Sequence, residues 1–156
     1  MPIRYVAMPT ETARALQSGA PDAYGMTPER RISDGDGVPC RHCLRTVAEG
    51  KPYLVLAYRP FPALQPYAET GPIFLCAEPC ARADEGADIP EMMRDAPDFI
   101  VRGYGLDDRI VYGTGGVVET GLIGDRAADL LRQDDIAYLH VRSARNNCYQ
   151  CRIERG

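Results

Sequence analysis

The stretch LIGDRAADLLRQDDIAYLHVR, residues 122–142, contains the two strongest secondary-structure patterns of the chain. Its first part repeats apolar residues at helical spacing and places charged residues on the other side, which predicts an amphipathic helix packed on a sheet. Its second part, Ile136–Arg142, alternates as a strand does. One face of that strand carries Ile136, Tyr138, His140 and Arg142, and the other carries Ala137, Leu139 and Val141.

More strands are expected on the N-terminal side of this stretch. Asp98–Tyr104 and Arg109–Tyr112 are rich in strand-forming residues. The glycine-rich segment 113–116 leads from the second of them into Val117 and Val118. Glycine suits a tight turn that needs positive φ angles, so we expect an antiparallel hairpin here.

The first half of the chain predicts three strands and a helix. Tyr53–Tyr58 is a continuous apolar run bounded by prolines, typical of a central strand, and Gly71–Cys76 is a similar run. Ile3–Met8 predicts a strand, and Thr10 is placed to cap a helix that continues to about Leu16. Residues 18–39 are rich in glycine and proline and predict a long loop. The whole pattern predicts one α+β domain over residues 1–156, with a mostly antiparallel sheet and two or three helices.

Length and composition limit the classes of function. A chain of 156 residues can bury a core without help from cross-links, and its hydrophobic content of 45% is ordinary for a globular protein. The net charge of −4 argues against a nucleic-acid partner, and no apolar run is long enough to span a bilayer. The N-terminus has no signal-peptide pattern, so we expect a cytoplasmic protein. A homodimer is compatible with the sequence.

Six cysteines form three close pairs, and they are the strongest functional signal. The outer two pairs have the Cys-x-x-Cys spacing that lets two thiolates bind one zinc ion. The predicted zinc ligands are Cys40, Cys43, Cys148 and Cys151, with Cys80, His42 and His140 as possible additional ligands. Cys76 or Cys80 could also replace a member of this set. Cys76 lies in an apolar strand, however, where a cysteine is more often a small buried hydrophobic residue.

Two alternatives to a zinc site remain open for these cysteines. Six is an even number, so disulfides fit the count, although thiols stay reduced in the cytoplasm. Cys40 is also a candidate nucleophile, because the neighbouring Arg41 and His42 would favour its thiolate. This second hypothesis makes the protein a thiol-dependent or metal-dependent enzyme. The sequence around Cys40 lacks the βαβ pattern of a thioredoxin fold, which argues against a thioredoxin-like redox enzyme.

The C-terminal tail is basic, although the chain as a whole is acidic. Arg142 and Arg145 lie in its densest polar stretch, close to His140. Arginine binds carboxylate and phosphate through paired hydrogen bonds, so this stretch is a candidate site for a small anionic ligand. The alternative is a strand end exposed to solvent.

The chain resembles a bacterial family catalogued as domain of unknown function 1203. The segments that carry the resemblance are 33–43 (SDGDGVPCRHC), 58–61 (YRPF), 67–74 (YAETGPIF), 102–104 (RGY) and 140–153 (HVRSARNNCYQCRI). The resemblance implies a bacterial cytoplasmic protein of one domain, and it implies no reaction or ligand. It also implies a histidine near Cys76 in similar proteins, so Cys76 departs from that pattern.

Overall fold

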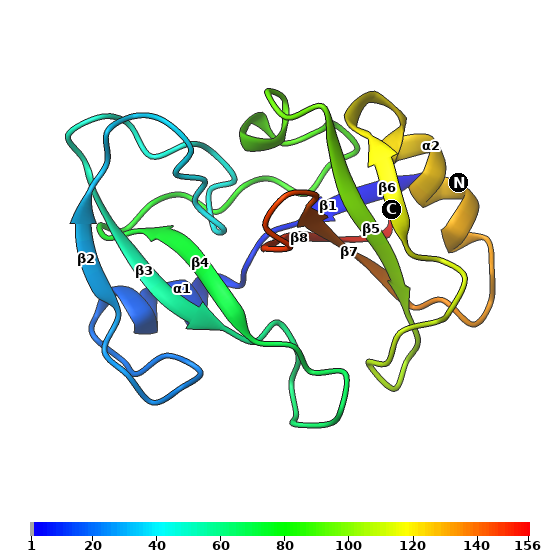
Figure 1. Cartoon of the computed structure of the whole chain (residues 1–156), viewed down its shortest axis with the longest axis horizontal. Coiled ribbons are helices and arrows are strands. Elements are labelled where there is room, and N and C mark those ends of the chain that lie inside the picture. The colour runs from blue at the N-terminus through cyan, green and yellow to red at the C-terminus, as the bar shows by residue number, and fades with distance from the viewer. Residues whose placement is uncertain (1) are drawn as a thin grey trace.

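Two antiparallel sheets stand side by side in the computed structural model, which describes residues 2–156 (Figure 1). The larger sheet has five strands in the order β1 (Ile3–Val6), β8 (Tyr149–Arg155), β7 (Tyr138–Ser143), β5 (Asp98–Tyr104) and β6 (Gly116–Glu119). The smaller sheet has three strands in the order β2 (Glu29–Ile32), β3 (Pro52–Tyr58) and β4 (Gly71–Cys76). The predicted α+β class is confirmed.

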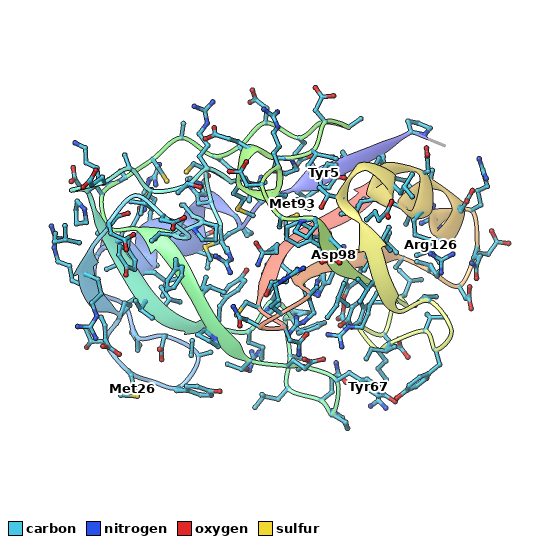
Figure 2. The ribbon with its side chains drawn as sticks, turned by 45° about the horizontal axis from the view of Figure 1, so that its top comes forward. Tyr5, Met26, Tyr67, Met93, Asp98 and Arg126 are labelled. Carbon is cyan, nitrogen blue, oxygen red and sulfur yellow. The ribbon has the colours of Figure 1, made fainter. Side chains whose placement is uncertain are left out.

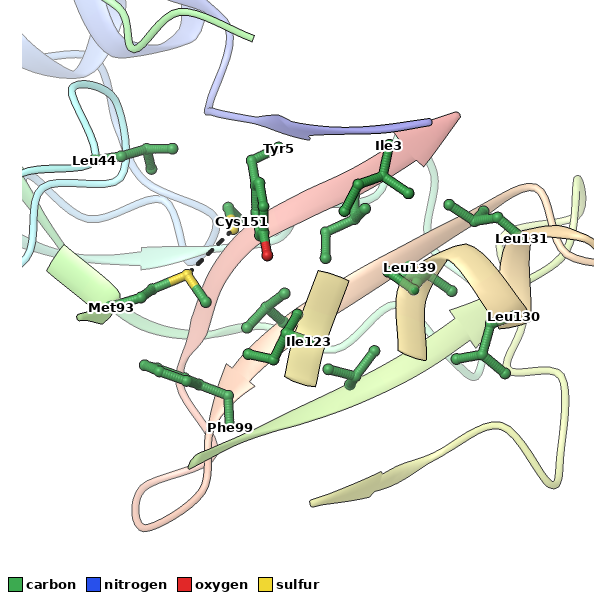
Figure 3. Close-up of a cluster of buried hydrophobic side chains, with 14 of the residues drawn as sticks. Ile3, Tyr5, Leu44, Met93, Phe99, Ile123, Leu130, Leu131, Leu139 and Cys151 are labelled. Atoms are coloured by element: carbon green, nitrogen blue, oxygen red, sulfur yellow. Dashed lines mark hydrogen bonds between the residues drawn. The ribbon is translucent and has the colours of Figure 1, made fainter. Parts of the chain in front are cut away.

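The predicted amphipathic helix is α2 (Ile123–Leu131), and it covers one face of the five-stranded sheet. Its buried residues are Ile123, Ala127, Leu130 and Leu131. They pack with Leu139 of β7 and Phe99 of β5 in the larger hydrophobic cluster (Figure 3). The alternation predicted for this strand is confirmed from Tyr138 on, because Leu139 and Val141 join this cluster whereas Tyr138 belongs to a separate one. It is wrong for the two residues before the strand, since Ile136 lies with Leu139 and Ala137 packs beside Tyr138. Two short 3-10 helices, η1 (Glu91–Met93) and η2 (Thr120–Leu122), complete this part of the chain.

The second cluster lies between helix α1 (Thr10–Gln17) and the three-stranded sheet. Ala13 and Leu16 of α1 are buried together with apolar residues of the sheet: Leu54, Leu56, Ile73 and Leu75. Cys40 belongs to this cluster, with Cys43, Cys76 and Cys80 packed against it. The small sheet and α1 therefore form the scaffold for four of the six cysteines.

The prediction of a hairpin around residues 113–116 was wrong for one of its two strands. Arg109–Tyr112 is not a strand, and β6 pairs with β5 instead, with Phe99 opposite Val118. The chain turns back at the end of β5, where Gly105 N–H donates to the Arg109 carbonyl oxygen at 3.0 Å. The Thr114 hydroxyl accepts a hydrogen bond from Gly103 N–H of β5 at 2.9 Å. The segment before β6 is therefore hydrogen-bonded to the end of β5.

Two further local predictions also differ from the structure. The loop expected over residues 18–39 contains β2, whose four residues are all exposed and so carry no alternating pattern. Thr10 does not cap α1, because Pro9 occupies the N-cap position and no side chain caps the helix. The Thr10 hydroxyl lies 2.9 Å from His42 Nε2 instead.

The surface carries isolated apolar side chains, as most globular proteins do. Figure 2 shows Met26 at the margin of the molecule, where it is 64% exposed, whereas Met93 lies inside. Among residues 2–156, no helix combines the length and the apolar character that crossing a bilayer would require.

Neighbouring residues at the start of α2 provide a test of the larger core. Ile123 is fully buried, whereas Leu122 is 51% exposed. We expect Ile123→Ala to lower the free energy of unfolding in urea by about 2–5 kcal/mol, because it leaves a cavity under the helix. Leu122→Ala should change it by about 0.5 kcal/mol or less. Equal effects of the two substitutions would contradict this packing.

Candidate metal centre

Four cysteine sulfurs converge beside the small sheet. Cys40, Cys43, Cys76 and Cys80 place their Sγ atoms within 4.8 Å of one another. Four sulfurs bound at about 2.3 Å to a central zinc ion stand about 3.8 Å apart in a regular tetrahedron. The distance from Cys40 Sγ to Cys80 Sγ is 3.9 Å. The cluster therefore has the dimensions of a four-thiolate metal site.

A tight turn brings Cys40 and Cys43 together. Leu44 N–H donates to the Cys40 carbonyl oxygen at 2.9 Å, and Cys40 N–H donates to the Arg45 carbonyl oxygen at 2.9 Å. Leu44 has a φ of 55°, in the left-handed region that glycine adopts most readily. Its side chain is buried in the larger core, which offsets the cost of this conformation.

Strand β4 holds the third cysteine of the cluster against this turn. Cys40 forms a parallel bridge with Phe74, and Arg41 N–H donates to the Phe74 carbonyl oxygen at 3.2 Å. Cys76 ends β4, and its backbone N–H donates to Cys40 Sγ at 3.3 Å. An N–H directed at a sulfur stabilises its thiolate form.

Helix α1 fixes the loop that connects Cys76 to Cys80. Arg14 donates from Nη2 to the Cys80 carbonyl oxygen at 2.7 Å. Gln17 donates from Nε2 to the Cys76 carbonyl oxygen at 2.9 Å. Both side chains lie on one side of α1, so the helix positions both ends of the loop.

His42 lies inside the turn and contacts the cluster through one ring nitrogen. Its Nδ1 is 3.1 Å from Cys80 Sγ, and its Nε2 is 2.9 Å from the Thr10 hydroxyl. Both contacts are satisfied when Nδ1 carries the proton and donates to the sulfur while the hydroxyl donates to Nε2. His42 would therefore support Cys80 from the second layer of a metal site.

Hydrogen bonds among the four thiols move their pKa values apart. A hydrogen bond from Cys43 lowers the pKa of Cys40 to about 6, and hydrogen bonding with Cys40 lowers that of Cys80. Hydrogen bonding with Cys40 raises the pKa values of Cys43 and Cys76. Metal binding needs deprotonated thiols, and this cluster already favours thiolates at two of its four positions.

A family model described as a protein of unknown function (DUF1203) matches residues 37–155. The chain belongs to the DUF1203 family. No curated protein and no solved structure matches it. The matched range contains all six cysteines, whereas α1, which holds the loop between Cys76 and Cys80, lies before it.

In this DUF1203 protein, the structure does not bring the last cysteine pair to the cluster. Cys151 lies in β8 and is fully buried in the larger core, where its Sγ is 3.9 Å from Met93 Sδ (Figure 3). Cys148 precedes the strand, and its sulfur contacts the Asn146 carbonyl oxygen at 3.7 Å. The reason is that the chain is extended from Tyr149 onward, so this Cys-x-x-Cys segment does not form a turn like that of Cys40 and Cys43.

Cys76 is the ligand candidate that sequence reasoning set aside, and Cys80 was named only as an additional one. A signal was present, because the spacing of Cys76 and Cys80 also falls within the range seen in zinc sites. Sequence reasoning gave this spacing little weight because Cys76 was expected to be a small buried residue of a strand. Cys76 is the last residue of β4, and its sulfur lies within 4.8 Å of the other three sulfurs.

His140 lies away from the cluster, in an aromatic cage on the other face of the five-stranded sheet. Its ring centroid lies 4.7–5.1 Å from four aromatic rings, those of Phe61, Tyr104, Tyr138 and Tyr149. Neither ring nitrogen has a hydrogen-bond partner among the described residues. Strand register places Arg102 and Arg152 on either side of it.

The two predicted anion-binding arginines already have internal partners. Arg142 is buried and donates to Glu69 at 3.0 Å and to Asn147 at 3.0 Å. Arg145 is exposed and forms an ion pair with Asp98 at 2.6 Å. The structure thus places them at separate carboxylates, and a shared anion site at these two residues stays a prediction.

The environment of His140 predicts a pH dependence of stability. Burial lowers its pKa well below the ordinary 6.5, and three positive charges act in the same direction: Arg142, Arg152 and Arg102. The unfolded chain therefore binds this proton more readily than the folded chain. The stabilising contribution of neutral His140 is complete above about pH 6.5 and declines as the pH falls, by up to about 1.4 kcal/mol per unit.

The substitution His140→Phe isolates this effect, because it keeps a ring in the cage and cannot take up a proton. We expect the free energy of unfolding of the native protein, relative to that of the variant, to fall by about 1 kcal/mol between pH 7.5 and pH 5.5. Urea titrations at the two pH values measure it. A difference that stays constant would show that His140 does not titrate as described.

Proposed function

We propose that this DUF1203 protein binds one zinc ion as a structural centre through Cys40, Cys43, Cys76 and Cys80. The observation that carries the proposal is the mutual approach of the four sulfurs within 4.8 Å. A four-sulfur donor set suits zinc, whose sites of this kind are tetrahedral and closed.

The surroundings of the cluster favour a structural role over a catalytic one. Four thiolates complete the coordination of zinc and leave no open position for a substrate. The ion would tie the Cys40 turn to the end of β4 and to the loop that follows it. Cys40 is fully buried, which disfavours the alternative in which its thiolate attacks a substrate.

Hydrogen-bond donors around the cluster match the charge of the proposed centre. A zinc ion with four thiolates carries a net charge of about −2. Donors that would stabilise this charge include the Cys76 N–H and the His42 ring. Burial lowers the pKa of the Arg41 guanidinium to about 10, and the charges of Cys148 and then of Cys40, a member of the cluster, oppose this effect. Thiols in such a site must stay reduced, which fits the cytoplasmic location expected from the sequence.

Metal analysis tests the proposal directly on tag-free protein. We expect about one zinc ion per chain, and its removal by a chelator should lower Tm by at least about 10 °C, equivalent to about 3 kcal/mol or more for a chain of this length. Cys40→Ser, Cys43→Ser, Cys76→Ser and Cys80→Ser should each lower the zinc content below one ion per chain, because each removes one of the four thiolates.

The matched control is Cys148→Ser, since Cys148 is also partly buried but lies outside the cluster. It should retain about one zinc ion per chain. Iron in place of zinc would keep the site and change its metal. Protein without either metal, with a mass that indicates disulfides under non-reducing conditions, would overturn the proposal.

The second layer of the site gives an independent prediction. His42→Phe keeps an aromatic ring but removes the donor to Cys80, so zinc affinity should fall by about 10-fold to 100-fold. Competition with a chromophoric chelator measures this change. Thr10→Val removes only the hydroxyl that orients the ring and should have a smaller effect. Unchanged affinity in both variants would mean that His42 merely fills space.

A further inference from the structure

A cavity of about 590 Å³ lies between the two sheets, on the face of the larger sheet opposite α2. Its walls come from the segment after β1, the end of β3, and strands β7 and β8. The volume falls within the range of sites for small organic molecules. The residues that matter for its chemistry are Tyr58, Arg59, Phe61, Arg82, His140, Tyr149, Arg152 and Glu154.

The charges on the cavity wall are mainly positive, although the chain has a net charge of −4. The lining residues include three arginines, Arg59, Arg82 and Arg152, and one carboxylate, Glu154. Arg82 also lies 3.7 Å from a carboxylate oxygen of Glu85, outside the lining. Glu154 is shared between Arg152 at 2.6 Å and Arg4 at 2.7 Å, so its charge is largely balanced. The cavity therefore presents an excess of positive charge to its contents.

Two of the three arginines keep donors available for a ligand. Arg82 is held in place by hydrogen bonds to the carbonyl oxygens of Met8 and Ala7. Arg59 uses only Nε, which donates to the Phe61 carbonyl oxygen at 3.2 Å. Arg152 pairs with Glu154 through Nε, while its guanidinium lies 3.7 Å from the centre of the Tyr138 ring. The terminal nitrogens of Arg59 and Arg152 thus remain as oxyanion donors.

His140 supplies the second, independent observation. It lines the cavity, it is fully buried, and neither of its ring nitrogens has a partner among residues 2–156. A buried polar group without a partner costs about 1–3 kcal/mol, so native structures seldom retain one. The neutral ring offers one donor and one acceptor to a molecule in the cavity.

We propose that this cavity binds a small organic oxyanion, with its carboxylate or phosphate at Arg59 and Arg152 and its apolar part among Tyr58, Phe61 and Tyr149. His140 then forms a hydrogen bond with the bound molecule. Guanidinium groups bind either oxyanion through paired N–H donors, and aromatic walls favour a planar apolar group. None of these residues belongs to the cysteine cluster, so this proposal does not depend on the zinc proposal.

Only two histidines occur in the chain, which makes ring nitrogens labelled with ¹⁵N a simple NMR probe. Benzoate, phenyl phosphate and inorganic phosphate serve as anions, with benzyl alcohol and benzylamine as neutral and cationic controls. We expect saturable shifts of the His140 signals with benzoate or phenyl phosphate, and none of the His42 signals. Inorganic phosphate should bind more weakly, because it has no group for the aromatic wall.

Substitutions then test whether Arg59 and Arg152 bind the anionic group of the ligand. Arg152→Gln and Arg59→Gln should each raise the Kd for the aromatic anion at least tenfold. Arg132→Gln is the control, because Arg132 lies exposed just after α2 and pairs only with Asp129. Urea unfolding of each variant checks that the fold is intact. If Arg152→Gln unfolds the chain, Arg59→Gln alone tests the role of the positive charge.

Several outcomes would overturn the proposal. One is the absence of saturable His140 shifts with every anion in folded, native protein. Another is equal binding of benzyl alcohol and benzoate, which would remove the role of charge. Unchanged affinity in both arginine variants would place the anion elsewhere. Metal content measured on the same samples separates these results from a failure of the zinc proposal.

Discussion

A buried arginine joins the two sheets, and the cysteine turn is built around it. The backbone of Arg41 accepts a hydrogen bond from Met8 N–H and donates one to the Phe74 carbonyl oxygen of β4. Its guanidinium donates to the Tyr149 carbonyl oxygen of β8 at 2.7 Å and to the Pro39 carbonyl oxygen at 2.7 Å. Burying a charge is costly, and burial lowers the pKa of Arg41 to about 10. The group remains charged at neutral pH, so nearby thiolates would stabilise it.

The two halves of the fold differ in how much apolar packing they contain. The five-stranded sheet is covered by α2 and by η1, and its cluster includes fully buried side chains of β5, β7 and β8: Val101, Leu139 and Ile153. The three-stranded sheet has α1 on one side, and its edge strand β2 is exposed along its whole length. A metal centre is most useful in the second half, because there it would add cross-links where apolar burial is limited.

The sequence predicted the elements whose residue types follow a regular pattern and missed those that have none. Helix α2 packs one face on a large core, whereas β7 was predicted from its alternating residue types although its first five residues are all buried. Strand β2 has no buried face and gave no signal. For the cysteines, spacing identified the turn at Cys40 and Cys43, where the backbone reverses. The same spacing at Cys148 and Cys151 was misleading, since identical spacing in an extended strand cannot direct both sulfurs to one point.

The proposed metal centre and the proposed anion cavity share structural supports. Thr10, in the first turn of α1, contacts His42 beside the cysteines, while Thr12 of the same turn lines the cavity. Cys80 belongs to the cluster, and Arg82, two residues further along the chain, forms part of the cavity wall. Arg82 in turn binds the carbonyl oxygens of Ala7 and Met8, which also line the cavity. An ion bound by the four cysteines would therefore fix the wall that faces His140. This connection would give the proposed metal site a role in ligand binding without any contact between metal and ligand.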